Sequence, residues 1–186
     1  MDIKAEISAL IGREGGYSNH PADKGGPTRW GITEQVARAY GYKGDMQALP
    51  RDMAIEIYRQ RYWLLPKLDK VADRYPLVAR ELFDIAVNMG QGVAVTFLQR
   101  CLNAFNDSAK HYADVGTDGL LGALSILALD NYRQRRGQEG GEVLLLAIRS
   151  LRGARYIDIT EARPANEAFT YGWFRRMVEL VRGAFK

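Results

Sequence analysis

Apolar residues recur at helical spacing along most of this 186-residue chain, and this pattern restricts the fold more than any other feature. Near the start, Ile3, Ile7, Leu10 and Ile11 fall on one face of a helix, and the pattern ends before Gly15. Similar patterns, closed by glycine or opened by proline, predict further helices. We expect these helices at residues 34–40, 50–63, 76–89, 93–105, 119–136, 142–151, 152–163 and 165–185.

Residues 17–32 interrupt the helical pattern. They show no helical period and hold five glycines or prolines before Ile32, which favours a loop or a small hairpin. Thr33 then has the character of an N-cap, with Glu34 in the first turn of the next helix. The predicted fold class is therefore mainly α, with a small β-hairpin or loop element after the first helix.

The composition excludes several kinds of site. Cys101 is the only cysteine, so an intramolecular disulfide and a multi-cysteine zinc site are both excluded. With only His20 and His111 as histidines, we expect no metal and no organic cofactor. The net charge of +4 fits a solvated, mildly basic surface, and it equally fits attraction to an anionic polymer.

The chain shows no sign of a membrane segment or a secretory signal. Residues 1–6 lack the basic stretch and long apolar run of a signal peptide, and the longest apolar stretch, 120–129, is too short to span a bilayer. We therefore expect synthesis as a soluble protein in the cytoplasm. A substrate outside the membrane would then require release or export of the protein.

Two acids near the start are the candidate catalytic groups. Glu14 continues the apolar face of the first helix at its C-terminal end, and both apolar surroundings and the helix dipole favour its protonated form. Asp23 lies between Pro21 and two glycines, in a turn where it would stay ionised. A protonated acid beside an ionised one is the arrangement that glycosidic bond cleavage requires. The alternatives are a surface glutamate and an aspartate that caps its own turn.

Three neighbours of these acids are candidate site residues. Thr28 could hold a water molecule or make a local hydrogen bond. Tyr17 and Trp30 flank the acids and could stack against sugar rings. Other aromatic residues, such as Trp63 and Trp173, fall at helical spacing and are expected in the core.

These residues carry a family resemblance. Residues 14–17 (Glu-Gly-Gly-Tyr) and 23–33 (Asp-Lys-Gly-Gly-Pro-Thr-Arg-Trp-Gly-Ile-Thr) resemble the signature of glycoside hydrolase family 108, the lysozyme-like N-acetylmuramidases of phages and bacteria. The order Glu14, Asp23, Thr28 is also similar to the catalytic set of phage-type lysozymes, although the last gap is one residue shorter here. The resemblance implies a lysozyme-like fold with Glu14 as the catalytic acid.

The resemblance continues beyond the signature. Residues 62–63 and 82–90 resemble the second conserved block of the family, in which Asp84 and Asn88 share a helix face and would contact the glycan. A capping or inter-helix hydrogen bond is the alternative for this pair. Residues 118–125 resemble the Asp-Gly-x-x-Gly motif of the peptidoglycan-binding segment that follows such hydrolases. We expect a muramidase segment at 1–91 and a helical peptidoglycan-binding segment at 92–186, packed as one globular unit.

The resemblance implies a peptidoglycan hydrolase, an endolysin or prophage enzyme that cleaves the β-1,4 bond between N-acetylmuramic acid and N-acetylglucosamine. The alternatives are a lytic transglycosylase that uses the same glutamate and a non-catalytic module that binds the wall or assists secretion. We expect peptidoglycan glycan strands as the partner, no nucleic acid, and a monomer. The basic amphipathic helix at residues 173–182 is expected to dock by its apolar face, and weak contact with an anionic membrane is its alternative.

Overall fold

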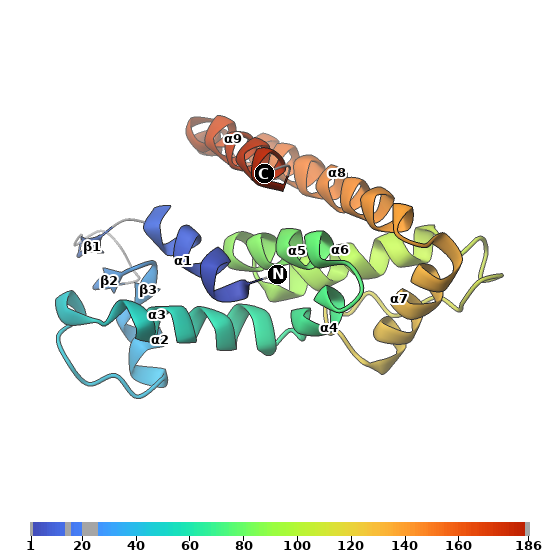
Figure 1. Ribbon diagram of the computed structural model, residues 1–186. Coiled ribbons are helices and arrows are strands. Elements are labelled where there is room, and N and C mark those ends of the chain that lie inside the picture. Colours follow the sequence, from blue (N-terminus) through green and yellow to red (C-terminus); the bar gives the residue numbers. More distant parts are fainter. Residues whose placement is uncertain (1, 14–15, 20–25, 185–186) are drawn as a thin grey trace. The chain divides into compact units, whose positions relative to one another are not determined.

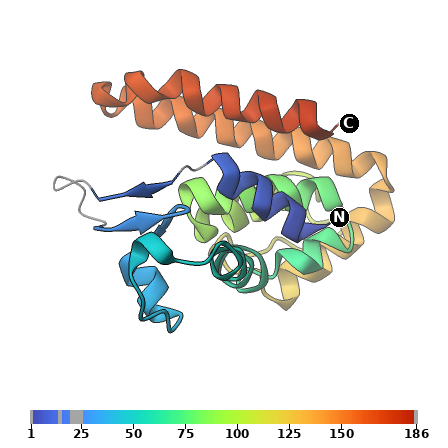
Figure 2. The same ribbon diagram turned by 60° about the vertical axis from the view of Figure 1, so that its left-hand side comes forward.

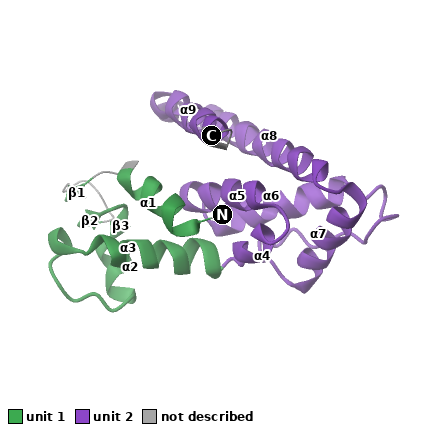
Figure 3. Ribbon diagram, in the orientation of Figure 1, with its two compact units in different colours: residues 1–65 green, residues 66–186 purple. Residues whose placement is uncertain are grey.

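The computed structural model describes residues 2–13, 16–19 and 26–184. Its contacts divide the chain into two compact units, residues 1–65 and 66–186, and each is described by itself (Figure 3). The division precedes the boundary expected at residues 91 and 92. It does so because helix α5 (Pro76–Met89) makes its contacts with α4 (Leu68–Ala72), α6 (Gln91–Ala104) and α8 (Glu139–Glu161), all in the second unit.

Unit 1 is organised around the pairing of two helices. Helix α1 (Ile3–Arg13) buries the predicted apolar face and packs against α3 (Arg51–Tyr58) (Figure 1). The Arg51 guanidinium joins them by donating hydrogen bonds to the carbonyl oxygen of Ser8, at 3.0 Å, and to its hydroxyl, at 2.6 Å. This packing fixes the end of α1, which lies directly before Glu14 in the chain.

The interruption at residues 17–32 forms the small β element that the sequence predicts. Strands β1 (Tyr17–Ser18), β2 (Thr28–Arg29) and β3 (Ile32–Thr33) make an antiparallel sheet in the order β1-β2-β3 (Figure 2). Helix α2 (Glu34–Ala39) follows at once, and the Thr33 hydroxyl accepts a hydrogen bond from the Val36 N–H at 3.4 Å. The predicted N-cap at Thr33 is therefore confirmed.

The helix expected at 50–63 consists of an α-helix followed by a π-helix. A short 3-10 turn, η1 (Met46–Ala48), precedes it, and α3 begins at Arg51 after Pro50. From Arg59 to Leu64 the chain continues as a π-helix, η2, in which the Leu65 N–H reaches the Gln60 carbonyl oxygen at 2.9 Å. The wider turn buries Trp63, as the sequence predicts.

Unit 2 is a helical assembly around one apolar core. Its elements after α6 are α7 (Ala123–Arg136), α8, the 3-10 turn η3 (Pro164–Asn166) and α9 (Glu167–Ala184) (Figures 1 and 2). Helices α5, α6 and α8 all contact one another and share the core. Its fully buried apolar residues include Leu82, Ile85, Leu98, Leu102, Leu144 and Ile148.

Four predicted helices differ from the structure, and one helix was not predicted. The segments 142–151 and 152–163 form the single helix α8, because Gly153 lies between two buried side chains, Arg152 and Tyr156, whose packing holds the helix together. The helix predicted at 119–136 starts only at Ala123. Helix α9 starts after the turn η3, two residues later than predicted, and α4 was not predicted. Tertiary packing outweighs the local preference of glycine in α8.

Helix α9 packs by an aromatic face onto α8. The Tyr156 ring lies 5.2 Å from the Trp173 ring and 5.8 Å from the Phe174 ring, measured between centroids. Phe169, Tyr171 and Val178 remain exposed. The docked arrangement expected for this basic helix is thus present, and membrane contact stays a prediction. In the described part of the chain, no helix is both long and apolar enough to cross a bilayer.

Gly90 allows α5 and α6 to meet without a linker. It ends one helix and caps the next at φ 95° and ψ 152°, a backbone conformation that a side chain strains. A Cβ at Gly90 would meet no atom within 4 Å, so the cost of a substitution comes from the backbone alone.

We expect Gly90→Ala to lower the free energy of unfolding by about 1–3 kcal/mol, because alanine must adopt this strained conformation. Urea denaturation followed by circular dichroism measures the loss. Gly92→Ala is the matched control, since Gly92 lies within α6 and its added methyl group also meets nothing within 4 Å. Equal unfolding midpoints for the two variants would contradict the assigned strain.

Candidate active site

The described frame of the candidate site is the end of α1 and the three-stranded sheet. Helix α1 ends at Arg13 and β1 starts at Tyr17, on either side of Glu14 in the chain. The connection from β1 to β2 spans residues 19–27 and contains Asp23. Glu14 and Asp23 themselves lie outside the described residues, so their roles stay predictions.

The turn between β2 and β3 holds Trp30 in an uncommon backbone conformation. Thr28 pairs with Thr33 and Arg29 with Ile32, which leaves Trp30 and Gly31 as a two-residue hairpin loop. Both have positive φ, 55° and 74°, as a type I′ turn requires. A tryptophan at positive φ is rare, and such strain is concentrated at functional sites.

Two contacts hold the Trp30 side chain at this turn. Its indole N–H donates a hydrogen bond to the Leu49 carbonyl oxygen at 3.0 Å. The Arg29 guanidinium lies over the ring, with its central carbon 4.8 Å from the ring centroid. Because the hydrogen bond to Leu49 and the Arg29 guanidinium both restrict the indole ring, Trp30 presents a rigid aromatic surface.

The sheet register separates the predicted site residues onto two faces. Tyr17, Arg29 and Ile32 are direct partners across the strands, so their side chains share one face. Thr28 projects from the opposite face, and its hydroxyl donates a hydrogen bond to the Gly26 carbonyl oxygen at 3.1 Å. The local hydrogen bond, which the sequence left as an alternative for Thr28, is therefore present.

Arg29 is a residue that sequence reasoning did not single out. Its Nε atom is buried and has no hydrogen-bond partner within the described ranges. A buried donor without a partner is costly and calls for an explanation in a native structure. The sequence held a signal for Arg29, because it lies between Thr28 and Trp30 in residues 23–33. In a strand, its side chain points to the face opposite that of Thr28.

Asp84 lies in unit 2, within a buried ion network. Its side chain is 3% exposed and accepts hydrogen bonds from Arg152 on α8 and from Arg176 on α9, the latter at 2.8 Å between Nη2 and Oδ1. Asn88 donates to the Asp84 carbonyl and carboxylate oxygens at 2.7 and 3.1 Å. The inter-helix bond left open by the sequence is thus what Asp84 makes. Asn88 is exposed, and glycan contact by this pair stays a prediction.

A second buried acid completes this network. Glu81 accepts hydrogen bonds from Arg152 at 2.7 Å and from Arg149 at 2.8 Å. Arg152 is fully buried, and its guanidinium also donates to the Tyr156 hydroxyl. The sequence carried a signal for this residue, since Arg152 lies four residues from both Ile148 and Tyr156 on the buried face of α8.

The electrostatics of Asp84 follow from two opposing effects. Burial raises the pKa of the carboxyl group. The charges of Arg152 and Arg176 and their hydrogen bonds lower this pKa by a larger amount, so it lies below its ordinary value. The stabilisation from Asp84 is therefore complete above the unfolded-state pKa of about 3.9, and it is lost as the pH falls through the lowered value.

The Asp-Gly motif and two polar residues of α6 hold the long connection between α6 and α7 in place. Gln99 donates a hydrogen bond to the Asp118 carboxylate at 2.9 Å and accepts one from the Gly119 N–H at 3.0 Å. Asn103 exchanges two hydrogen bonds of 2.8 Å with the backbone of Val115. The Asp-Gly motif therefore has a structural role in holding the connection between α6 and α7.

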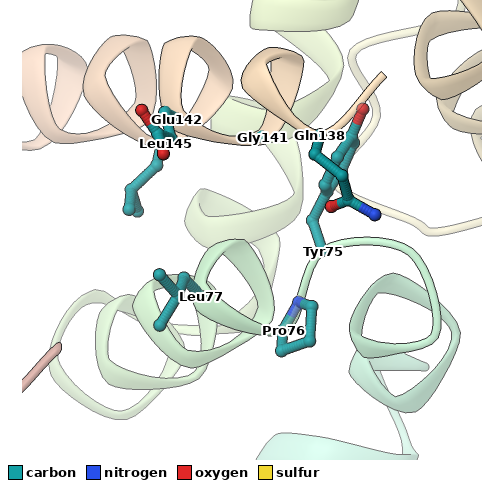
Figure 4. A pocket seen from close by; sticks show the side chains of 7 residues that line it. All are labelled: Tyr75, Pro76, Leu77, Gln138, Gly141, Glu142 and Leu145. Carbon is teal, nitrogen blue, oxygen red and sulfur yellow. The ribbon is translucent and has the colours of Figure 1, made fainter. Parts of the chain in front are cut away.

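Unit 2 also has surface hollows. One of about 190 Å³ lies between the start of α5 and the start of α8, and Figure 4 shows the side chains that line it. Its walls are mainly apolar, with Gln138 and Glu142 as polar groups. A larger hollow of about 530 Å³ lies between α6 and α8. Within the described ranges, no group of three or more His, Cys, Asp or Glu side chains could hold a metal ion.

Two protein-family models match the chain in succession. Residues 7–90 match the model of glycosyl hydrolase 108, and residues 93–178 match the model of a predicted peptidoglycan domain. The structure of SagA from Brucella abortus is similar, with a TM-score of 0.67 and 24% sequence identity over 98% of this chain and 93% of the other. At this identity the likeness concerns the fold alone. No curated protein sequence matches the chain.

The matching hydrolase segment defines a glycoside hydrolase, and the fold is mainly helical and lysozyme-like. Residues 7–90 form a glycosyl hydrolase 108 segment, and a predicted peptidoglycan domain follows it at residues 93–178. It is therefore a peptidoglycan hydrolase.

We expect Asp84→Asn to lower the free energy of unfolding by about 3 kcal/mol, because it removes the charge that compensates the buried Arg152. Thermal or urea unfolding at neutral pH measures this loss. Asp107→Asn makes the same chemical change in an exposed pair with Lys110 and should alter stability by less than about 0.5 kcal/mol. Similar losses in both variants would contradict a stabilising role of the network.

Proposed function

We propose that this peptidoglycan hydrolase is an N-acetylmuramidase, which hydrolyses the β-1,4 bond between N-acetylmuramic acid and N-acetylglucosamine with Glu14 as general acid. The observation that supports this most is the glycosyl hydrolase 108 match over residues 7–90, which includes both acids and the strands β1 to β3. The reaction needs two carboxyl groups with separate roles and an activated water.

Each acid has its own part in the mechanism. Glu14 follows the C-terminal end of α1, where the helix dipole disfavours a negative charge, and it gives its proton to the glycosidic oxygen. Asp23 follows β1 and stays ionised, so that it orients the water or stabilises the positive charge that develops on the sugar ring. The Thr28 hydroxyl makes a local hydrogen bond to the Gly26 carbonyl oxygen on the other sheet face, so it has no part in this mechanism.

The aromatic residues of the sheet provide the sugar platform. Tyr17 lies on the sheet face of Arg29, and Trp30 is held at the hairpin loop beside it. Sugar rings have apolar faces that pack against such rigid rings. The strained conformation of Trp30 supports a binding role, because a purely structural turn would favour asparagine or glycine there.

Two other functions compete with hydrolysis. A lytic transglycosylase also uses one glutamate, but its nucleophile is a hydroxyl group of the substrate, and it has no need of Asp23. A non-catalytic module that binds the wall or assists secretion would retain the fold without turnover. The products of the reaction distinguish all three.

We expect purified protein to release muropeptides with reducing ends from isolated cell walls, and mass spectrometry identifies these ends. Glu14→Gln should abolish this release while the circular dichroism spectrum stays unchanged. Asp23→Asn should lower the rate by more than about tenfold, equivalent to about 1.4 kcal/mol of activation free energy.

Three results would change the assignment. Anhydro ends would identify a transglycosylase. Undigested walls that still sediment with the protein would identify a binding module. Continued digestion by Glu14→Gln would remove this residue from the role of acid.

We expect Tyr17→Leu to raise KM for wall fragments by about fivefold to tenfold with a smaller change in kcat, because it removes a stacking contact worth about 1 kcal/mol. Steady-state kinetics on soluble glycan fragments measures the two constants. Tyr171→Leu is the matched control, since Tyr171 is 81% exposed on α9. An unchanged KM for Tyr17→Leu would assign this residue to the sheet alone.

A further inference from the structure

A groove with a charged rim lies between α6 and α8. It has a volume of about 530 Å³, within the range of sites that hold small ligands. Its floor is apolar and includes Phe97 and Leu151, and its rim carries Arg100, Arg155 and Asp158. We call this hollow the α6–α8 groove. All of its lining residues belong to unit 2.

The two arginines of the rim are available to a ligand. Arg100 and Arg155 are exposed, and neither makes an ion pair or a side-chain hydrogen bond with any residue of the described ranges. Their neighbours on α8 differ, because Arg149 and Arg152 are paired with the buried acids of α5. The guanidinium groups at the groove can therefore form new charge-assisted hydrogen bonds without breaking existing ones.

Two other hollows among the described residues of unit 2 have a different charge. The hollow in Figure 4 has one acid, Glu142, and no cation among its lining residues. A third hollow, of about 370 Å³, has one cation and one acid, Arg136 and Glu139. Of the three, the α6–α8 groove is the one with an excess of positive charge. It also keeps one carboxylate, Asp158, which suits a ligand with an amino group.

The ligand chemistry that fits is a short peptide with free carboxylates and one free amine. Peptidoglycan offers such groups on its stem peptides, whereas the lactyl carboxyl of its sugar is consumed in the link to the peptide. The small apolar side chains of a stem peptide fit the apolar floor, and its carboxylates suit bidentate contact with arginine.

We propose that the α6–α8 groove binds the stem peptide of peptidoglycan through Arg100 and Arg155. All of its lining residues except Gly92 fall within residues 93–178, the segment that matches a predicted peptidoglycan domain. This inference rests on the proposed function, because it takes peptidoglycan as the substrate. Contact with the peptide would hold the enzyme on the wall, while the hydrolase segment acts on the glycan.

The probe is a soluble stem tetrapeptide that carries no sugar and has an acetylated N-terminus, as in the link to the lactyl group. A glycosidase cannot cleave it, so the active full-length protein can be used. Isothermal calorimetry at low salt measures its Kd. We expect the double variant Arg100→Gln, Arg155→Gln to weaken binding at least tenfold. A peptide with amidated carboxyl groups should lose a similar factor with the unchanged protein.

The matched control is Arg135→Gln, Arg163→Gln. It removes the same charge from two exposed arginines that do not line the groove, and it should keep Kd within twofold. Thermal unfolding should be the same for both double variants, since none of the four side chains makes an ion pair in the described structure.

The release of reducing ends from walls is measured in parallel. Reducing ends without peptide binding by the unchanged protein, or equal Kd values for the two double variants, would overturn the groove proposal and leave the hydrolase intact. Peptide binding that depends on Arg100 and Arg155, without reducing ends, would reject the muramidase and support the groove.

Discussion

The second unit depends on one buried set of charges, in which Glu81 and Asp84 on α5 meet Arg152 on α8 and Arg176 on α9. Removing these groups from water is costly, and the cost is offset only because each acid accepts hydrogen bonds from two arginines. Such a network requires specific distances, so it aligns three helices that an apolar contact alone would let slide. The network also joins the aromatic packing between α8 and α9, because Arg152 donates to the hydroxyl of Tyr156, whose ring packs against Trp173 and Phe174.

The described frame of the candidate site lies in unit 1, and the buried charge network lies in unit 2. In unit 1, a short sheet and the end of α1 frame the segment with the two acids, and the turn at Trp30 gives a fixed aromatic surface. In unit 2, Gln99 and Asn103 on α6 fix the connection that follows this helix. Those side chains are occupied within the fold, whereas Arg100 and Arg155 at the α6–α8 groove make no ion pair within the described residues and are the groups proposed to contact the wall.

Helical spacing allowed much of the fold to be predicted. The helix at 76–89 and the N-cap at Thr33 follow from local rules, because propensity and capping act over a few residues. The break in α8 between residues 151 and 152 was predicted wrongly for the same reason, since a local rule cannot include the burial of Arg152. The π-helix at residues 59–64 likewise depends on packing around Trp63.

The sequence by itself determined the class of protein and its candidate acids, because a catalytic motif is a matter of residue type and spacing along the chain. Only the tertiary structure decided that Asp84 serves a buried network, that Tyr17 and Arg29 share a sheet face, and that Arg100 and Arg155 border one groove. These outcomes depend on contacts between residues far apart in the chain, and their free energy is gained only when desolvation and packing occur together.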